Sequence, residues 1–248
     1  MSRAVQPIRP FWRYYGGKWR AVASGYYPAP KHSTIIEPFA GAAGYSLHHH
    51  DRDVVLVDLN PKIAAIWRWL IAASPSDVAS LPPTIEGDVR DLDLPDGARW
   101  LLGFWCGSAL GAPLNSPTSW RLNYPRQAWT PAIRARVADG ASKIKHWRII
   151  EGPNSTAPDV VATWFVDPPY VVGGSRYATG SRNVDFDDLA AWCRTRRGQT
   201  IVCEATGATG LPFRHVGTMQ AANTQGRGKA SEAVWIHDGA RGAQGVHL

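Results

Sequence analysis

The sequence feature that most limits the possible folds is an apolar run at residues 160–166 (VVATWFV), which is followed at once by Asp167, Pro168, Pro169 and Tyr170. A run of β-branched and aromatic residues of this length suits a central strand of a parallel sheet. In such sheets, ligands bind at the edge formed by the carboxyl ends of the strands. The run therefore predicts a buried strand that ends in a candidate site.

Alternating strand and helix patterns surround this run. We expect strands at residues 34–39, 53–58, 200–204 and 232–237, a short strand at 84–87, and helices at 44–50 and 186–197, the last stopped by Gly198. Another helix is predicted where Asn60 can cap its start, with Pro61 in its first position and apolar residues along one face. This order predicts an α/β fold with a doubly wound, Rossmann-like sheet.

Residues 93–146 lack this alternation and contain five prolines. We expect an insertion there, so that residues 1–92 and 147–248 form one discontinuous domain. The formal net charge is +7, and residues 101–150 hold seven cations against one anion. Such a bias attracts the phosphates of nucleic acid, although a solvated basic face gives the same pattern. The cations assigned to DNA are Arg121, Arg126, Arg134, Arg136, Lys143 and Lys145.

Other features exclude several classes of protein. Three cysteines without CxxC spacing indicate neither a disulfide framework nor a zinc site, and they suit a reducing, cytoplasmic location. The most apolar segment, residues 63–73, is interrupted by Arg68, so we expect no membrane span. We predict no metal, because the histidines at 48–50 lack companion ligands and suit a surface cap. The twelve tryptophans suit core packing or, in a basic protein, stacking with bases.

A cofactor site is indicated at the ends of the first two strands. Residues 37–44 (EPFAGAAG) are small enough for a ligand to approach the backbone, although a purely structural turn has the same composition. Asp58 follows Gly41 by 17 residues and can accept hydrogen bonds from ribose hydroxyls. No phosphate-binding GK[ST] loop is present. The pattern favours a nucleoside cofactor without phosphates, such as S-adenosylmethionine.

The residues after the apolar run suit methyl transfer to a base. An exocyclic amine is a poor nucleophile, because its lone pair is delocalised into the ring. Asp167 and the carbonyl of Pro168 can accept its two hydrogens, and Tyr170 offers a ring for stacking with an extruded base. In-line transfer from a sulfonium then depends mainly on positioning.

At this point the sequence resembles the Dam-type DNA adenine-N6 methyltransferases, including phage-encoded members. The resemblance rests on five motifs in order over residues 11–236: WRYYGGK at 12–18, EPFAG at 37–41, VDLN at 57–60, DPPY at 167–170 and KASEAVW at 229–235. It implies an S-adenosylmethionine-dependent enzyme with a target-recognition region at residues 93–146. The expected partner is double-stranded DNA, with the protein a monomer or a weak dimer.

The resemblance also implies roles for individual residues. Those expected to bind the cofactor are Tyr14, Gly17, Lys18, Glu37, Phe39, Gly41, Asp58, Asn60 and Glu151. The catalytic residues would be Asp167, Pro168, Pro169 and Tyr170. Apart from the resemblance, residues 170–183 are rich in Gly and Ser and suit a loop that closes over the base, with Arg176 on a DNA phosphate, although a mobile loop without this role has the same composition. The family's acidic contact to the cofactor's adenine has no clear counterpart. Only Glu151 or Asn154 could replace it before the DPPY strand, while Asp88 is better suited to a helix cap or turn.

Three alternatives remain at this stage. The same acceptors could serve the N4 amine of cytosine, and only the resemblance favours adenine. A non-catalytic DNA-binding protein on this fold is disfavoured because Asp58 and Asp167 are both present. A nicotinamide-dependent oxidoreductase would share the first βαβ unit, but it would not need the Pro-Pro carbonyl.

Overall fold

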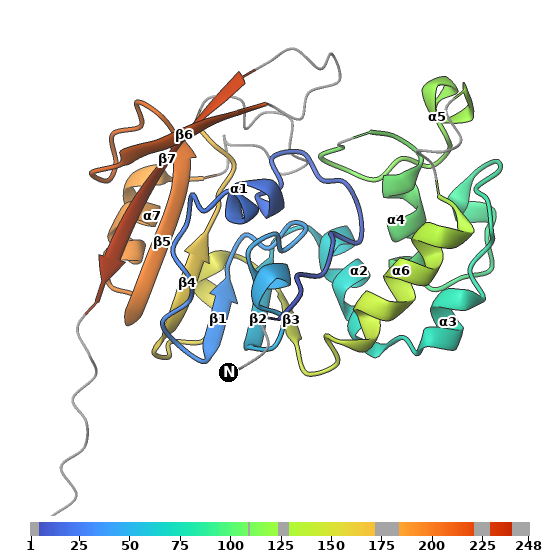
Figure 1. Cartoon of the computed structure of the whole chain (residues 1–248), viewed down its shortest axis with the longest axis horizontal. Coiled ribbons are helices and arrows are strands. Elements are labelled where there is room, and N and C mark those ends of the chain that lie inside the picture. Colours follow the sequence, from blue (N-terminus) through green and yellow to red (C-terminus); the bar gives the residue numbers. More distant parts are fainter. Residues whose placement is uncertain (1–4, 109, 124–128, 172–183, 221–228, 240–248) are drawn as a thin grey trace, which may run out of the picture.

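The computed structural model describes residues 5–108, 110–123, 129–171, 184–220 and 229–239. Within them, a seven-stranded sheet lies beside a group of helices (Figure 1). The strands, in chain order, are β1 (Thr34–Glu37), β2 (Asp53–Asp58), β3 (Arg148–Glu151), β4 (Ala162–Val166), β5 (Gly198–Ala205), β6 (Arg214–Gln220) and β7 (Lys229–Asp238).

The sheet is mostly parallel, with the strand order β3-β2-β1-β4-β5-β7-β6. The first five strands in this order pair in parallel, whereas β7 pairs antiparallel with both β5 and β6. From β1, the chain continues to β2 on one side, while β4 lies on the other side and leads to β5. The junction of β1 and β4 is therefore a topological switch point, where a ligand crevice is expected.

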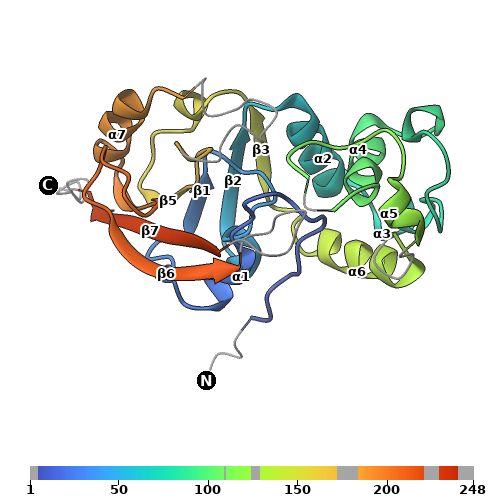
Figure 2. The ribbon, with the colours of Figure 1, turned by 90° about the horizontal axis from the view of Figure 1, so that it is seen from above.

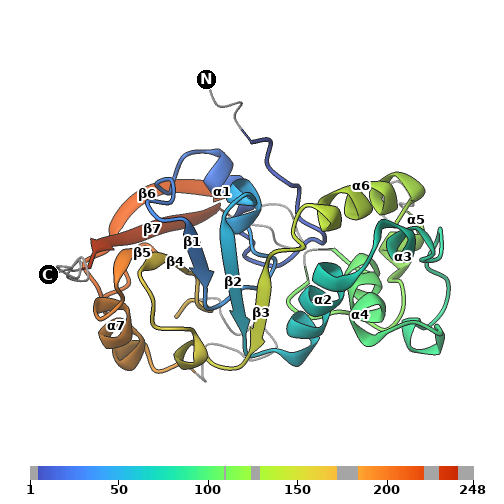
Figure 3. The same cartoon turned by 90° about the horizontal axis from the view of Figure 1, so that it is seen from below.

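The helices are α1 (Trp19–Ala23), α2 (Pro61–Ala72), α3 (Pro75–Ala79), α4 (Asp96–Trp105), α5 (Ser119–Asn123), α6 (Pro131–Ser142) and α7 (Phe186–Arg194). Short 3₁₀ helices occur at η1 (Ser46–His49), η2 (Val89–Asp91) and η4 (Asn154–Thr156). Helices α1 and α7 lie on opposite faces of the sheet (Figures 2 and 3). The predicted α/β class is thus confirmed, and the arrangement is compatible with a Rossmann-like fold.

A helical group made of α2 to α6 lies next to β3, at one edge of the sheet (Figure 1). Its helices α4, α5 and α6 fall within residues 93–146, whereas α2 and α3 come from outside that range. Its core is continuous with the rest of the molecule, because Phe104 of α4 stacks on Trp12, whose ring centroid is 5.6 Å away. Trp12 also contacts Trp67 of α2 at 5.2 Å. These tryptophans therefore pack the core.

Several predicted elements have the expected type but different bounds. Residues 162–166 of the apolar run form the buried strand β4, whereas Val160 and Val161 are exposed before it. Helix α2 begins as predicted, with the Asn60 side chain accepting a hydrogen bond from the Lys62 amide at 3.0 Å. The helix expected at residues 44–50 is only the 3₁₀ helix η1. Gly198 does not simply stop a helix: it is the first residue of β5, and a Cβ there would lie 2.3 Å from the Ala162 carbonyl oxygen.

Other sequence predictions were wrong or incomplete. The short strand expected at residues 84–87 does not form: only Ile85 packs against the core, and the chain turns at Gly87, where φ is +75°. Strands β3 and β6 were not predicted. Both are sheet-forming segments without a long apolar run, so their pairing depends on neighbours far away in the sequence.

Candidate functional site

A cavity of about 370 Å³ lies at the carboxyl ends of β1, β2 and β4, at the switch point of the sheet. Its volume is within the range of small-molecule and cofactor sites. The wall is formed by the segment around Gly17, the turn after β1, the end of β2, η4, the residues after β4 and the start of α7. The site that the sequence predicts at strand ends thus coincides with a cavity.

Asp58, the last residue of β2, is fixed by two backbone hydrogen bonds. One carboxylate oxygen accepts the amide of Gly41 at 2.8 Å, and the other accepts the amide of Asn60 at 2.8 Å. Burial raises the pKa of Asp58 to about 6, although these two hydrogen bonds oppose the shift. Each oxygen keeps a further lone pair, so the carboxylate can still accept hydroxyl groups of a ligand in the cavity.

The turn after β1 needs its small residues. Gly41 has a φ of +46°, and a Cβ there would lie 2.8 Å from the Tyr14 ring. A Cβ on Gly44 would lie 2.6 Å from the backbone nitrogen of Trp19. The N-terminal segment therefore packs directly on this turn and forms part of the cavity wall.

Asp167, directly after β4, forms an ion pair with Lys18. The Nζ–Oδ1 distance is 2.7 Å, and the Lys18 side chain is 7% exposed. Burial raises the pKa of Asp167 to about 6, and the Lys18 ammonium counteracts part of this rise. Lys18 also donates to the Gly16 carbonyl at 3.0 Å. The GGK segment and the DPPY segment, about 150 residues apart in the sequence, thus meet at one carboxylate.

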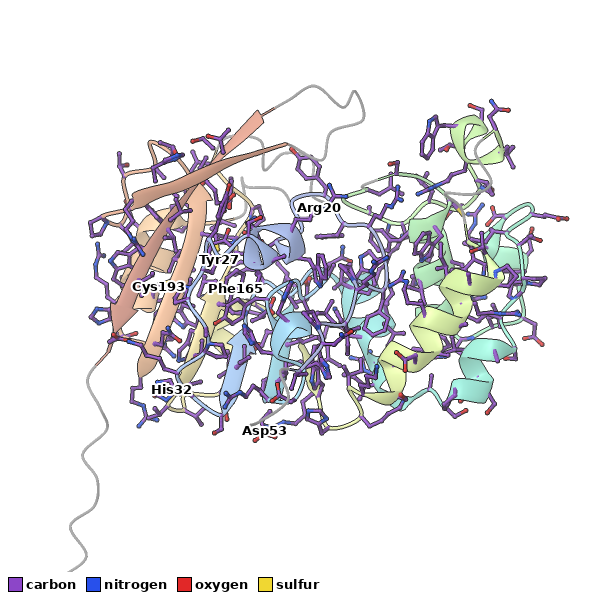
Figure 4. All side chains as sticks on the ribbon, viewed as in Figure 1. Arg20, Tyr27, His32, Asp53, Phe165 and Cys193 are labelled. Carbon is purple, nitrogen blue, oxygen red and sulfur yellow. The ribbon has the colours of Figure 1, made fainter. Side chains whose placement is uncertain are left out.

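Tyr170 lies beside this ion pair. The Lys18 ammonium lies 4.6 Å from the centroid of the Tyr170 ring, and the Tyr170 hydroxyl donates to Glu232 of β7. Glu232 also accepts the Tyr27 hydroxyl at 2.8 Å. Tyr27 itself packs edge-on against Phe165 of β4 at 5.1 Å (Figure 4). Tyr170 is therefore held between Lys18 and β7.

Two further carboxylates are buried near these strand ends. Glu37 of β1 lines the cavity and accepts the Ser46 amide at 2.6 Å, and burial raises its pKa to about 8. Glu204 of β5 accepts the Ala205 amide at 2.8 Å, and burial raises its pKa to about 7. With these pKa values, Glu37 is mostly protonated at neutral pH, and Glu204 changes its protonation state near neutral pH.

The cavity brings together most of the predicted site residues. Its lining includes Tyr14, Gly17, Lys18, Glu37, Phe39, Gly41, Asp58, Asn60, Asp167 and Pro169. Tyr170 and Pro168 do not line it; Pro168 borders a smaller neighbouring cavity of about 110 Å³. Glu151 does not line it either, since it ends β3 and pairs with Arg68 at 3.4 Å. Of the two candidates for the adenine contact, Asn154 is the one at the cavity, while Asp88 caps η2.

The sequence analysis missed one wall of the cavity, formed by the N-cap of α7 and by residues along that helix. They follow the DPPY segment in the chain and include Asp185, Asp188, Leu189 and Trp192. Their only sequence signal was the position of the helix after the central strand. An aromatic ring and two carboxylates in this wall add groups that can contact a ligand.

Several predicted DNA-binding cations are used inside the protein. Arg121 is buried and donates to the Gly107 carbonyl at 2.7 Å, and Arg136 donates to the Pro10 carbonyl at 2.9 Å. Arg134 and Lys145 also donate to backbone carbonyls, and Lys143 pairs with Asp139 at 2.7 Å. Arg126 and Arg176 lie outside the described residues. Much of the basic block therefore stabilises the fold, which the net charge alone could not indicate.

The described residues contain no group of three or more His, Cys, Asp and Glu side chains that could hold a metal ion. His48 bonds the Trp19 carbonyl at 2.9 Å and packs against the Trp19 ring, so it is half-buried rather than a surface cap. The three cysteines are free and buried. Across the described ranges, no helix has the length and apolar character needed to cross a membrane.

The fold and the site define an α/β protein with a mostly parallel, Rossmann-compatible sheet and a carboxylate-lined cavity at its switch point. Comparison with protein-family models and with curated proteins found no match. The function therefore has to be argued from the site.

Proposed function

We propose that this protein is an S-adenosylmethionine-dependent DNA methyltransferase that acts on the N6 amine of adenine. The observation that carries the proposal is that Asp58 and Asp167 border one cavity, one at the end of β2 and the other after β4. A ribose-binding carboxylate and an amine-binding carboxylate are the two groups that this reaction requires.

The residues present fit the proposed cofactor. The cavity has the volume for it, Asp58 has lone pairs for ribose hydroxyls, and Phe39 and Trp192 provide aromatic walls. Asn154 offers an amide at the same wall, which can both donate to and accept from an adenine edge. When bound, S-adenosylmethionine supplies an electrophilic methyl group on a sulfonium.

The protein's own residues would orient the base. Asp167 accepts one amine hydrogen, the Pro168 carbonyl accepts the other, and both draw the nitrogen lone pair out of conjugation. Tyr170 does not line the large cavity, but Lys18 contacts both its ring and Asp167. This position suits a base site that lies beside a cofactor site. As the methyl group is added, Asp167 stabilises the positive charge on the nitrogen and then accepts its proton.

The test is to incubate the protein with S-adenosylmethionine and unmethylated DNA of varied sequence, and to identify the modified nucleoside by mass spectrometry. We expect N6-methyladenine. N4-methylcytosine would move the proposal to cytosine, and no modified base on any DNA would overturn it.

The matched control is Asp167→Ala. We expect it to abolish methyl transfer while cofactor binding, measured by calorimetry, is largely kept, because Asp167 acts on the base. Normal turnover in this variant would contradict the role of Asp167. Loss of cofactor binding in Asp58→Ala, with the fold intact, would support the assignment of the other carboxylate.

A further inference from the structure

Glu232 is a buried carboxylate that the methyl-transfer chemistry above does not use. It lies in β7, opposite Ala205 of β5, and is 5% exposed. The C-terminal part of the chain thus sends one acid side chain into the cluster around the DPPY segment.

Two phenols share the Glu232 carboxylate. The hydroxyls of Tyr27 and Tyr170 both donate to the same oxygen, Oε1. A carboxylate has no proton to give, so both phenols have to act as donors, and such charge-assisted bonds are stronger than neutral ones. The Tyr170 hydroxyl is therefore held in one position from outside its own segment.

The opposite charge in this cluster is Lys18. Its ammonium is 2.7 Å from Asp167 and 4.0 Å from Glu232, and it lies 4.6 Å from the Tyr170 ring centroid. Lys18 therefore covers one face of the Tyr170 ring while Glu232 holds its hydroxyl. Together these contacts define the plane and direction of the ring next to Asp167.

We propose that Glu232 is a positioning residue that fixes the Tyr170 ring in the orientation needed for stacking with the target base. The inference rests on the proposed function. Glu232 acts through the Tyr170 hydroxyl and touches neither the base nor the cofactor. Tyr27 supports it by holding the carboxylate, and the edge-on contact of Tyr27 with Phe165 anchors this support to β4.

The experiment is a double-mutant cycle of Glu232→Ala and Tyr170→Phe, measured as single-turnover methyl transfer to DNA. We expect each single variant to lower the rate about tenfold, as for one lost charge-assisted hydrogen bond. The loss in the double variant should fall well short of the product of the two single losses, because both changes remove the Tyr170–Glu232 bond. Each change also removes one bond of its own, since Glu232 accepts from Tyr27 and Tyr170 also bonds Asp167. Cofactor affinity should stay within about twofold, since a structural collapse would weaken it and a positioning defect would not.

Two controls separate positioning from general damage. Glu232→Gln keeps an acceptor oxygen for the phenols and should recover most of the rate. Ser231→Ala changes the preceding residue of β7, whose hydroxyl bonds Thr206 instead, and should leave the rate unchanged. If Glu232→Ala does not fold, Glu232→Met removes the acceptor at similar volume and replaces it in the cycle.

The outcomes are distinct. Independent losses, about a hundredfold together in the double variant, would overturn the role of Glu232 and leave the methyltransferase proposal standing. An equal loss in Glu232→Gln and Glu232→Ala would do the same, because the acceptor would then not matter. If the protein without any substitution modifies no DNA, both proposals are overturned.

Discussion

Buried carboxylates distinguish this site at the scale of single residues. Burial raises the pKa of Asp58 and Asp167 to about 6, of Glu204 to about 7 and of Glu37 to about 8. Shifts of this kind concentrate at functional sites, where the environment sets the protonation state that the chemistry needs. The charge of the site therefore changes within the pH range in which most enzymes work.

The rate of methyl transfer should follow the ionisation of Asp167. In the proposed reaction the ionised form accepts the amine hydrogen, so below the Asp167 pKa of about 6 the single-turnover rate should fall about tenfold per pH unit, and above it the rate should level off. A stopped-reaction series from about pH 5 to about pH 8 measures this. A rate that stays constant down to the lower limit would contradict the role of Asp167.

Glu37 should make the folded protein less stable as the pH rises. Its pKa in the folded state, about 8, exceeds the value of 4.5 expected for an exposed glutamate. Between these values the folded state binds more protons than the unfolded state, so stability is greatest below the lower value and is lost as the pH rises through the upper one. Glu37→Gln should flatten this dependence of the free energy of unfolding, measured by denaturant titration. An identical slope in both proteins would show that Glu37 does not hold its proton.

Helix α2 illustrates how an element is held at both ends. Asn60 caps its start, and Lys145, which follows α6, donates to the carbonyls of Ile71 at 3.0 Å and Leu70 at 3.2 Å at its end. A cation at this end also interacts favourably with the helix dipole. One side chain therefore ties α2 to the end of the predicted insertion.

Lys145→Met should lower the free energy of unfolding by about 1–3 kcal/mol, because terminal carbonyls of α2 lose a charged donor. Lys143→Met is the matched control, since Lys143 pairs with the exposed Asp139, and such surface pairs contribute at most about 1 kcal/mol. Chemical denaturation of the two variants measures the difference. Equal stability would mean that the α2 carbonyls do not depend on Lys145.

The whole molecule carries a net charge of +7, and Arg121, Arg134 and Arg136 of its most basic block lie in helices α5 and α6. The guanidinium groups of all three donate hydrogen bonds to backbone carbonyls. Net charge alone therefore overstates the number of cations ready to meet phosphates. Binding measurements at several salt concentrations can separate the two uses.

If Arg134 and Arg136 contact DNA, Arg134→Ala combined with Arg136→Ala should weaken binding. The slope of log K against log salt should also become shallower by about one unit for each lost phosphate contact. Lys145→Met should leave this salt-dependence slope unchanged, because the Lys145 ammonium already donates to the carbonyls of α2. An unchanged slope in the double variant would mean that both arginines serve the fold and that DNA binds elsewhere.

The sequence alone determined the strand-and-helix order around the site. The apolar run of β4, the Asn60-Pro61 start of α2 and the carboxylates that end β2 and follow β4 were all predicted, because these features depend on residues a few positions apart. Parallel strands gather their carboxyl ends at one edge, so the approximate location of Asp58 and Asp167 also followed.

Only the tertiary structure decided which groups meet Asp167 and Tyr170. Lys18 and Glu232 come from opposite ends of the chain, and no local pattern specifies that they share a cluster. It also decided that Arg121 and Lys145 serve backbone carbonyls, and that β3 and β6 form at all. Burial, pKa shifts and ion pairs are properties of the packed chain, because they depend on distances that sequence spacing does not fix.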